Sequence, residues 1–240
     1  MINKTINSLI FTVIFYTAPS FSAGIGLAVT RVIYPAGSHG VTVELNNSGK
    51  EVYLVQPFIS SHYAERKDAP FTVTPAVFRL EGGAENILRI NSLPDIEKKP
   101  QNQESLFWLV VKAVPSSTEQ KWSPNTGGVT GGVKLGLGTA IKLIYRPEVL
   151  STPGRKDFGL LRFTRVRNGV DIYNPGPYYI NLSYLSFDGT RVVDKRPEQY
   201  IIQPFSSTHY DVNTAKFIAK VAWGVINDIG GIYEYTGEIK

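Results

Sequence analysis

The sequence predicts an all-β protein made of two β-sandwich domains in series. Short runs of alternating apolar and polar residues recur along the chain, and Gly, Pro, Asn and Asp separate them, which is the pattern of strands joined by tight turns. No ten-residue segment carries the apolar stripe of an amphipathic helix, because the best local candidate, 213–220, is too short. The length of 240 residues suffices for two domains of about 100 residues each.

The strand pattern divides the chain into an N-terminal domain over 24–147, a linker over 148–156 and a C-terminal domain over 157–240. The linker is largely polar and contains Pro153-Gly154, as expected of a hinge. Strands are predicted before it at 29–35, 40–45, 51–55, 71–74, 86–90, 105–111 and 133–143. Strands are predicted after it at 160–166, 169–173, 178–184, 200–202, 209–212, 217–222 and 231–235.

The first 23 residues have the layout of a secretory signal peptide. Lys4 precedes the mostly apolar run from Leu9 to Ala18, and small residues follow it up to Ala23. That run is shorter than the roughly 20 apolar residues that a membrane span needs. Because the chain has no cysteine, an exported form has no disulfide, which favours the bacterial periplasm over eukaryotic secretion.

The composition and motifs argue against catalysis and against nucleic-acid binding. The formal net charge of +5 is spread among acidic residues, with no basic cluster interleaved with aromatic residues. His39, His62 and His209 show neither metal-ligand spacing nor a paired carboxylate. The glycine-rich segment 127–132 lacks the Lys-Ser/Thr ending of a phosphate loop. We therefore expect no enzyme activity, no cofactor, no metal and no nucleic-acid partner.

One predicted strand, 133–143, has a composition suited to pairing with another protein. Apolar residues occupy every second position from Val133 through Leu135 and Leu137, with one interruption at Thr139, and lysine, glycine and alanine lie between them. Proteins normally protect an apolar edge strand, because its unpaired N–H and C=O groups recruit other chains. We expect this strand to be shared with a partner, or with a second copy of the chain when no partner is bound.

Two basic residues lie in otherwise apolar strands. Arg31 belongs to the run 29–35, and Lys142 lies near the end of the shareable strand. Each alone suits a solvent-facing position, whereas the two together, on strands that lead to the linker, could form an anion-binding pair. Lys142 and Leu135 have opposite parity along an ideal strand, so one partner contacts both only if the strand twists or bulges between them.

Six collinear segments make the sequence resemble the periplasmic pilus and fimbrial chaperones of the chaperone–usher pathway. They cover nearly the whole chain after residue 23, and they are Thr30–Pro35, Phe71–Pro75 with Arg79–Gly82, Pro100–Trp108, Ile141–Pro147, Asn174–Tyr179 and Asn227–Gly231.

The resemblance implies a fold, a function and a set of residues. The fold would be two immunoglobulin-like domains in an L or boomerang arrangement. The chain would bind pilin subunits, stabilise them by donor-strand complementation and deliver them to an outer-membrane usher. Arg31 and Lys142 would bind the subunit's C-terminal carboxylate. Val133, Leu135 and Leu137 would be donated to the subunit, and Glu104, Arg146 and Asp228 would form an interdomain charge network.

A different class of function, a two-domain carbohydrate-binding protein, remains open at the level of sequence. A sugar site needs an exposed aromatic platform, for which Trp108, Trp122 and Trp223 are the candidates. Trp108 and Trp223 lie inside apolar strands and are expected in the cores, whereas Trp122 lies in a long polar loop. An adhesive subunit is disfavoured, because the chain contains strands enough for two complete sandwiches.

Overall fold

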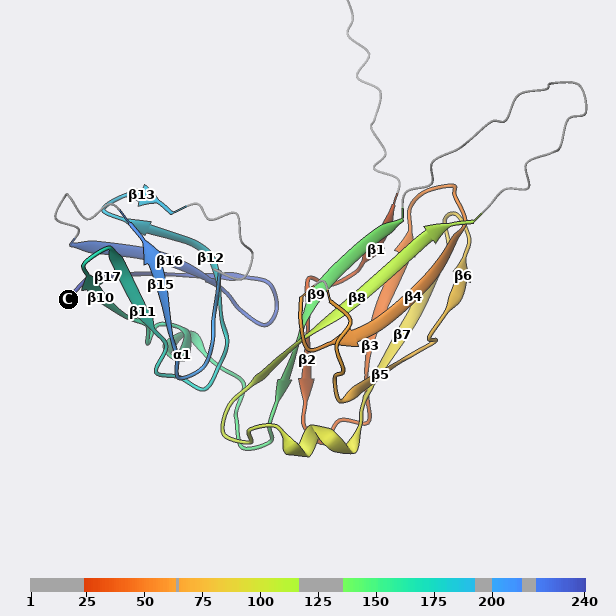
Figure 1. The fold of residues 1–240 in the computed structure, drawn as a ribbon, viewed down its shortest axis with the longest axis horizontal. Coiled ribbons are helices and arrows are strands. Elements are labelled where there is room, and N and C mark those ends of the chain that lie inside the picture. The colour runs from red at the N-terminus through yellow and green to blue at the C-terminus, as the bar shows by residue number, and fades with distance from the viewer. Residues whose placement is uncertain (1–23, 64, 117–135, 193–199, 213–218) are drawn as a thin grey trace, which may run out of the picture.

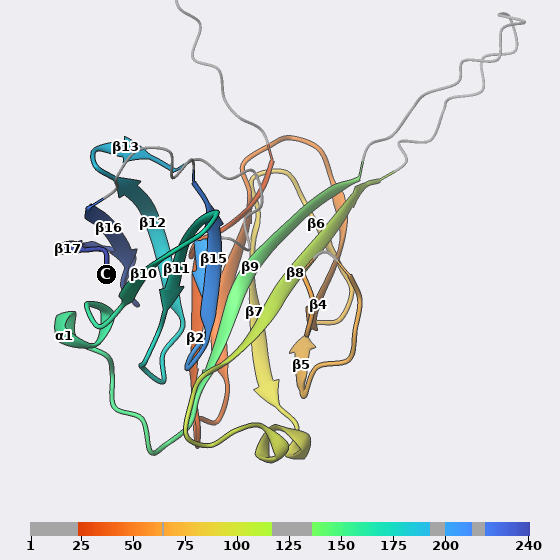
Figure 2. The same ribbon diagram turned by 60° about the vertical axis from the view of Figure 1, so that its left-hand side comes forward.

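A computed structural model of the chain contains two β-sandwiches, which confirms the predicted fold class (Figure 1). The structure describes residues 24–63, 65–116, 136–192, 200–212 and 219–240. The predicted signal peptide and two of the three predicted donor residues, Val133 and Leu135, lie outside these ranges. The two sandwiches are inclined to each other and joined at one end, as Figures 1 and 2 show.

The N-terminal sandwich consists of a four-stranded and a five-stranded sheet. The first has the order β1-β3-β7-β5, with the bounds Ile25–Leu27, Val41–Asn47, Glu85–Ser92 and Phe71–Thr74. The second has the order β2-β9-β8-β4-β6, with the bounds Arg31–Pro35, Leu137–Arg146, Ser105–Pro115, Tyr53–Ser60 and Phe78–Leu80. A 3-10 helix, η1 (Pro94–Lys98), precedes β8. Alternate side chains of both sheets, such as Leu45, Leu88, Leu109 and Leu143, fill the core between them.

The C-terminal sandwich is smaller and has the same layered construction. One sheet has the order β10-β11-β15, with the bounds Arg162–Val166, Gly169–Tyr173 and Ser207–Asp211. The other has the order β13-β12-β16-β17, with the bounds Thr190–Arg191, Ile180–Phe187, Lys220–Ile226 and Ile232–Glu238, and β14 (Ile201–Ile202) also pairs with β12. Ile172, Leu185, Ile202 and Val225 are fully buried in its core.

The structure refines the predicted elements at four places. The predicted strand 29–35 corresponds to β2 alone, which begins at Arg31 and pairs with β9, whereas the strand before it, β1, was not predicted and pairs with β3 in the other sheet. Two short strands, β6 and β13, were not predicted, since neither is long enough to show alternation. A four-residue helix, α1 (Arg155–Phe158), begins inside the predicted linker, where Asp157 Oδ2 accepts a hydrogen bond from Gly154 N at 2.7 Å.

The two sandwiches contact each other through the outer face of the five-stranded sheet. Trp108 and Val110 of β8 form a buried cluster with Ile201 of the C-terminal domain, and Tyr179 packs against it. The amide of Glu104 donates a hydrogen bond to the carbonyl of Pro177 at 2.9 Å. Trp108 is therefore part of the interdomain contact, and its side chain is only 7% exposed.

Candidate functional site

Strand β2 determines where the site lies, because it begins at Arg31. Among the described strands, β2 and β9 are the one parallel pair, and their register places Arg31 directly opposite Lys142. The next pair, Val32 and Leu143, is buried in the core. Since side chains alternate between the faces of a sheet, Arg31 and Lys142 lie together on the outer face, beside the interdomain contact.

Arg31 connects this face to the C-terminal domain. Its Nη1 donates a hydrogen bond to the carbonyl of Ile226, the last residue of β16, at 3.0 Å. Its Nε is buried and has no hydrogen-bond partner within the described part of the chain. Burial lowers the pKa of the guanidinium from its ordinary value, and the nearby carboxylate of Asp228 partly opposes that shift.

Lys142 is half-buried and carries an uncompensated charge. Burial first, and the positive charge of Arg31 second, lower the pKa of its ammonium group from 10.5 to about 8. Within the residues that the structure describes, the ammonium group of Lys142 has no hydrogen bond and no ion pair. The two adjacent cations therefore form a site with unused donors, to which a carboxylate would bring both charge compensation and hydrogen bonds.

Strand β9 has an unpaired edge that leads to these cations. Its second half, from Lys142 to Arg146, pairs with β2 on one side and with β8 on the other. Among the described residues, its first half, from Leu137 to Ile141, pairs with β8 alone. A strand from another protein could continue the line of β2 along this edge. If that strand ran parallel to β9, its C-terminus would arrive at Arg31 and Lys142.

Leu137 lies on the core-facing side of this edge. It is 41% exposed and borders a hollow of about 220 Å³ that is also lined by Ile25, Val111 and Ala113. The register of β9 against β8 is uninterrupted from Leu137 to Tyr145, so no bulge separates Leu137 from Lys142. The two side chains therefore lie on opposite faces, and a partner contacts both by pairing with the edge that they share.

Glu104, Arg146 and Asp228 lie together at the junction of the two sandwiches. Arg146 Nη2 and Nε donate to Glu104 Oε1 at 2.6 and 2.8 Å, and Nη1 donates to Asp228 Oδ2 at 2.8 Å. The second oxygen of Glu104 accepts a hydrogen bond from the amide of Tyr179 at 2.7 Å. Burial raises the pKa of Glu104, and the charge of Arg146 opposes this shift. The sequence-predicted residues thus connect the ends of β8 and β9 with the β16–β17 turn.

The surroundings of His209 differ from the expectation, because the sequence showed no carboxylate paired with it. Its Nδ1 lies 2.6 Å from Asp171 Oδ1, and its Nε2 lies 3.4 Å from Asp211 Oδ1. Asp171 pairs with His209 across β11 and β15, a neighbourhood that sequence separation hides. A hydrogen bond to Asp171 raises the pKa of His209. Among the described residues no group of His, Cys, Asp and Glu could hold a metal ion.

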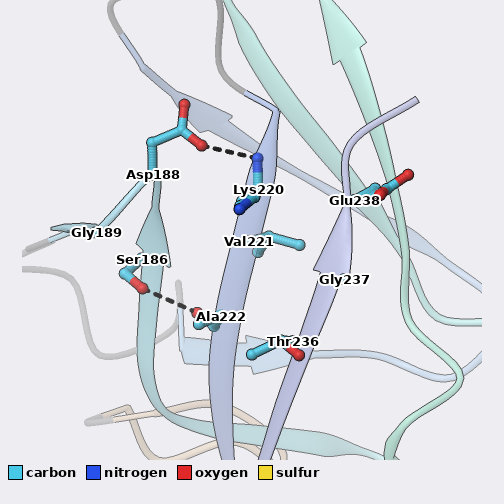
Figure 3. A pocket seen from close by; sticks show the side chains of 9 residues that line it. All are labelled: Ser186, Asp188, Gly189, Lys220, Val221, Ala222, Thr236, Gly237 and Glu238. Carbon is cyan, nitrogen blue, oxygen red and sulfur yellow. Dashed lines mark hydrogen bonds between the residues drawn. The ribbon is translucent and has the colours of Figure 1, made fainter.

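A hollow of about 610 Å³ lies beside β12, β16 and β17 (Figure 3). Two carboxylates, Asp188 and Glu238, line it, and Asp188 already accepts hydrogen bonds from the backbone amides of Ala219 and Lys220. Ser186 Oγ donates to the carbonyl of Ala222 at 3.3 Å. These polar groups hold the sheet and its turns together, so the hollow is not a candidate site.

No helix within the described ranges is long and apolar enough to span a membrane.

Comparison with known proteins identifies the class of protein. The N-terminal domain model of the PapD pili and flagellar-assembly chaperones matches residues 24–151, and the PapD C-terminal domain model of pili assembly chaperones matches residues 158–237. The chain therefore belongs to the pilus-assembly chaperone family.

The relatives of the chain are chaperones of the same kind. It is 34% identical to the chaperone protein FocC of Escherichia coli over 96% of each chain. The crystal structure of the E. coli chaperone DraB superposes with a TM-score of 0.78 at 33% identity, covering 91% of this chain and 97% of DraB. A chain from the complex of the Salmonella enterica SafA pilin with the SafB chaperone superposes with a TM-score of 0.75 at 28% identity, covering 90% and 96%.

The buried charge of Lys142 leads to a prediction about stability. Because the pKa of Lys142 is lower in the folded chain than in the unfolded chain, the unfolded state binds more protons between pH 8 and 10.5, and stability from this group rises with pH there. At pH 7, Lys142→Met should therefore raise the free energy of unfolding by up to roughly 3 kcal/mol. The advantage should shrink between pH 8 and pH 10.

Urea denaturation of both proteins from pH 7 to pH 10 measures this difference. The matched control is Lys50→Met, which removes the same charge at an exposed position. A destabilised Lys142→Met variant, or a gain that does not change with pH, would contradict the assignment of a desolvated ammonium group.

Proposed function

We propose that this chain is a periplasmic chaperone of a Gram-negative bacterium that binds pilin subunits by donor-strand complementation and delivers them to an outer-membrane usher. One observation carries the proposal: the unpaired edge of β9 runs directly to two half-buried cations on the adjoining strands. Binding and delivering a subunit in this way require only complementary shape and charge, so we propose no enzyme activity. Membership in the pilus-assembly chaperone family and the likeness to SafB, whose partner is the SafA pilin, support this proposal.

The edge of β9 suits a subunit that lacks a strand of its own sandwich. Such a subunit has an exposed apolar groove, and a strand from a chaperone supplies both ladder hydrogen bonds and side chains for that groove. Val133, Leu135 and Leu137 are the proposed donor residues, at alternate positions along the strand. Full burial of each aliphatic side chain contributes roughly 1.5–3 kcal/mol before the cost of ordering.

Arg31 and Lys142 determine the register in this proposal. The C-terminal carboxylate of a parallel client strand would bind where β2 begins, between the two cations. A one-residue slip would separate the carboxylate from the cations and turn every donated side chain to the wrong face. The client would also recover the electrostatic cost of the buried ammonium group, because a carboxylate raises the pKa that burial and Arg31 have lowered.

Glu104, Arg146 and Asp228 are proposed to hold the angle between the two domains. Glu104 is 2% exposed, and its two oxygens bond to Arg146 and to the amide of Tyr179 across the junction. Both oxygens of a buried carboxylate must be satisfied, which restricts the relative positions of the domains.

The carbohydrate-binding alternative gains no support, because Trp108 and Trp223 are buried and Trp122 lies outside the described residues.

The anion site predicts the effect of removing either cation. Arg31→Ala and Lys142→Ala should each reduce the recovery of a chaperone–pilin complex at least tenfold, because a charge-assisted bond to the subunit's carboxylate is lost. The measurement is purification of the complex after periplasmic co-expression with a pilin, with circular dichroism as the check on folding. Complex yields equal to wild type from both folded variants would refute the carboxylate anchor.

The donor strand predicts a face-specific effect. Leu137→Asp should reduce complex recovery at least tenfold, because it places a charge in the client's apolar groove. Gly138→Asp is the matched control: it adds the same charge one residue along, on the opposite face, where a Cβ meets no atom within 4 Å. Equal recovery from both variants would argue against donation of the face that Leu137 occupies.

The interdomain network predicts a large loss of stability on removal of its central cation. Arg146→Met leaves Glu104 buried without its ionic partner, and should cost about 3–5 kcal/mol and widen the distribution of domain angles. The control Arg79→Met breaks the exposed pair with Glu81 and should cost at most about 1 kcal/mol. Urea denaturation and small-angle X-ray scattering measure the two effects, and unchanged curves in both would exclude this role.

A further inference from the structure

The turn between β16 and β17 carries an exposed apolar surface next to the anion site. Ile229, at the tip of the turn, is 92% exposed, and Ile232 is 53% exposed. Ile226 and Ile232 are directly opposite each other where the two strands meet the turn, so they share one face of the sheet. We call Ile226, Ile229 and Ile232 the isoleucine tip. Isolated exposed aliphatic residues are common, whereas two exposed isoleucines next to the half-buried Ile226, at and beside one turn, form a small apolar surface.

The turn that presents the isoleucine tip is fixed by hydrogen bonds. The amide of Gly230 donates to the carbonyl of Asn227 at 3.1 Å, and the side chain of Asn227 accepts from the amide of Gly231 at 2.8 Å. Gly230 has a φ of 86°, a conformation that favours glycine. Asp228, the residue before Ile229, is bonded to Arg146 at 2.8 Å. Ile229 is therefore held outward by a turn that is anchored to the N-terminal domain.

The isoleucine tip is continuous with the proposed carboxylate site. Arg31 lies between the two, because it is paired with Lys142 in the sheet and donates to the carbonyl of Ile226 at 3.0 Å. In Figure 1 the turn after β16 extends toward β9 and β2. A polypeptide whose carboxylate reaches Arg31 and Lys142 therefore brings its neighbouring residues against this turn, since strand residues advance only about 3.3 Å each.

We propose that the isoleucine tip is a second contact surface for the pilin subunit, supplied by the C-terminal domain. The inference rests on the proposed function. It adds a contact between the same pilin subunit and the β16–β17 turn, which takes no part in donor-strand pairing. The occupant is an apolar patch of the subunit next to its C-terminal residues. Because Arg31 and Asp228 fix the turn relative to β9, the surface is preformed and binding orders few additional groups.

The test compares Ile229→Asp with Ile87→Asp in binding to a pilin subunit that co-purifies with the wild-type chain. Ile87 is 62% exposed on β7, in the four-stranded sheet that does not contain β2 or β9, so it is an exposed isoleucine remote from the proposed site. Ile229→Asp should weaken the complex about tenfold or more, and Ile87→Asp should leave it unchanged. Ile229→Leu should bind like wild type. Thermal unfolding of the free variants checks that all three fold.

The outcomes separate this inference from the proposed function. Loss of the subunit with Lys142→Ala but unchanged affinity with Ile229→Asp would overturn the role of the isoleucine tip and leave donor-strand binding intact. Unchanged affinity with Lys142→Ala would instead count against the carboxylate site itself. If Ile229→Asp altered only the self-association of the free chain in size-exclusion chromatography, a second copy would be the occupant and the inference would be wrong.

Discussion

The parallel pairing of β2 with β9 is the constraint on which the rest of the site depends. Because β2 begins at Arg31, it covers only the second half of β9 and leaves the edge from Leu137 to Ile141 open. The same pairing places Arg31 beside Lys142, so the open edge ends at two cations. A longer β2 would close the edge, and an antiparallel β2 would alter the register that brings the cations together. The location, direction and charge of the proposed binding site thus follow from one short strand.

The site carries an energetic cost in the free protein, and in the proposed function binding of the client offsets that cost. Lys142 remains half-buried beside a second cation, which lowers its pKa to about 8. Such an arrangement is unfavourable for folding, and it makes the site complementary to a carboxylate, because no described residue forms an ion pair with the ammonium group of Lys142. In the neighbouring network, Arg146 at the end of β9 forms ion pairs with both Glu104 and Asp228. The junction therefore contains one cluster whose charges pair with each other and one pair of cations without a bound anion. The first is suited to holding the domains together, and the second is suited to binding a partner.

Much of the fold was predicted from the alternation of apolar and polar residues alone, and each element that was missed has a local cause. Strands such as β5 and β11 were predicted with their observed bounds, because turn residues flank clear alternating runs. Strands β6 and β13 are too short to alternate, and α1 is a single turn fixed by Asp157. The carboxylates around His209 were missed because one of them, Asp171, lies on a neighbouring strand. The isoleucine tip could not be predicted from the sequence either, because the exposure of a side chain at a turn depends on the contacts that hold the turn in place.

By itself, the sequence determined the all-β class, the succession of two sandwiches and the residue types of a shareable strand. These depend on period, composition and turn chemistry, which are local properties. The tertiary structure alone decided that Arg31 and Lys142 lie opposite each other and that Arg146 bonds to both Glu104 and Asp228. It also decided that part of β9 has β8 as its one neighbour within the described parts of the chain. These features bring together residues up to 195 positions apart, as in the bond from Arg31 to Ile226. Only packing fixes such distances, because the chain's local preferences do not specify which strand lies next to which.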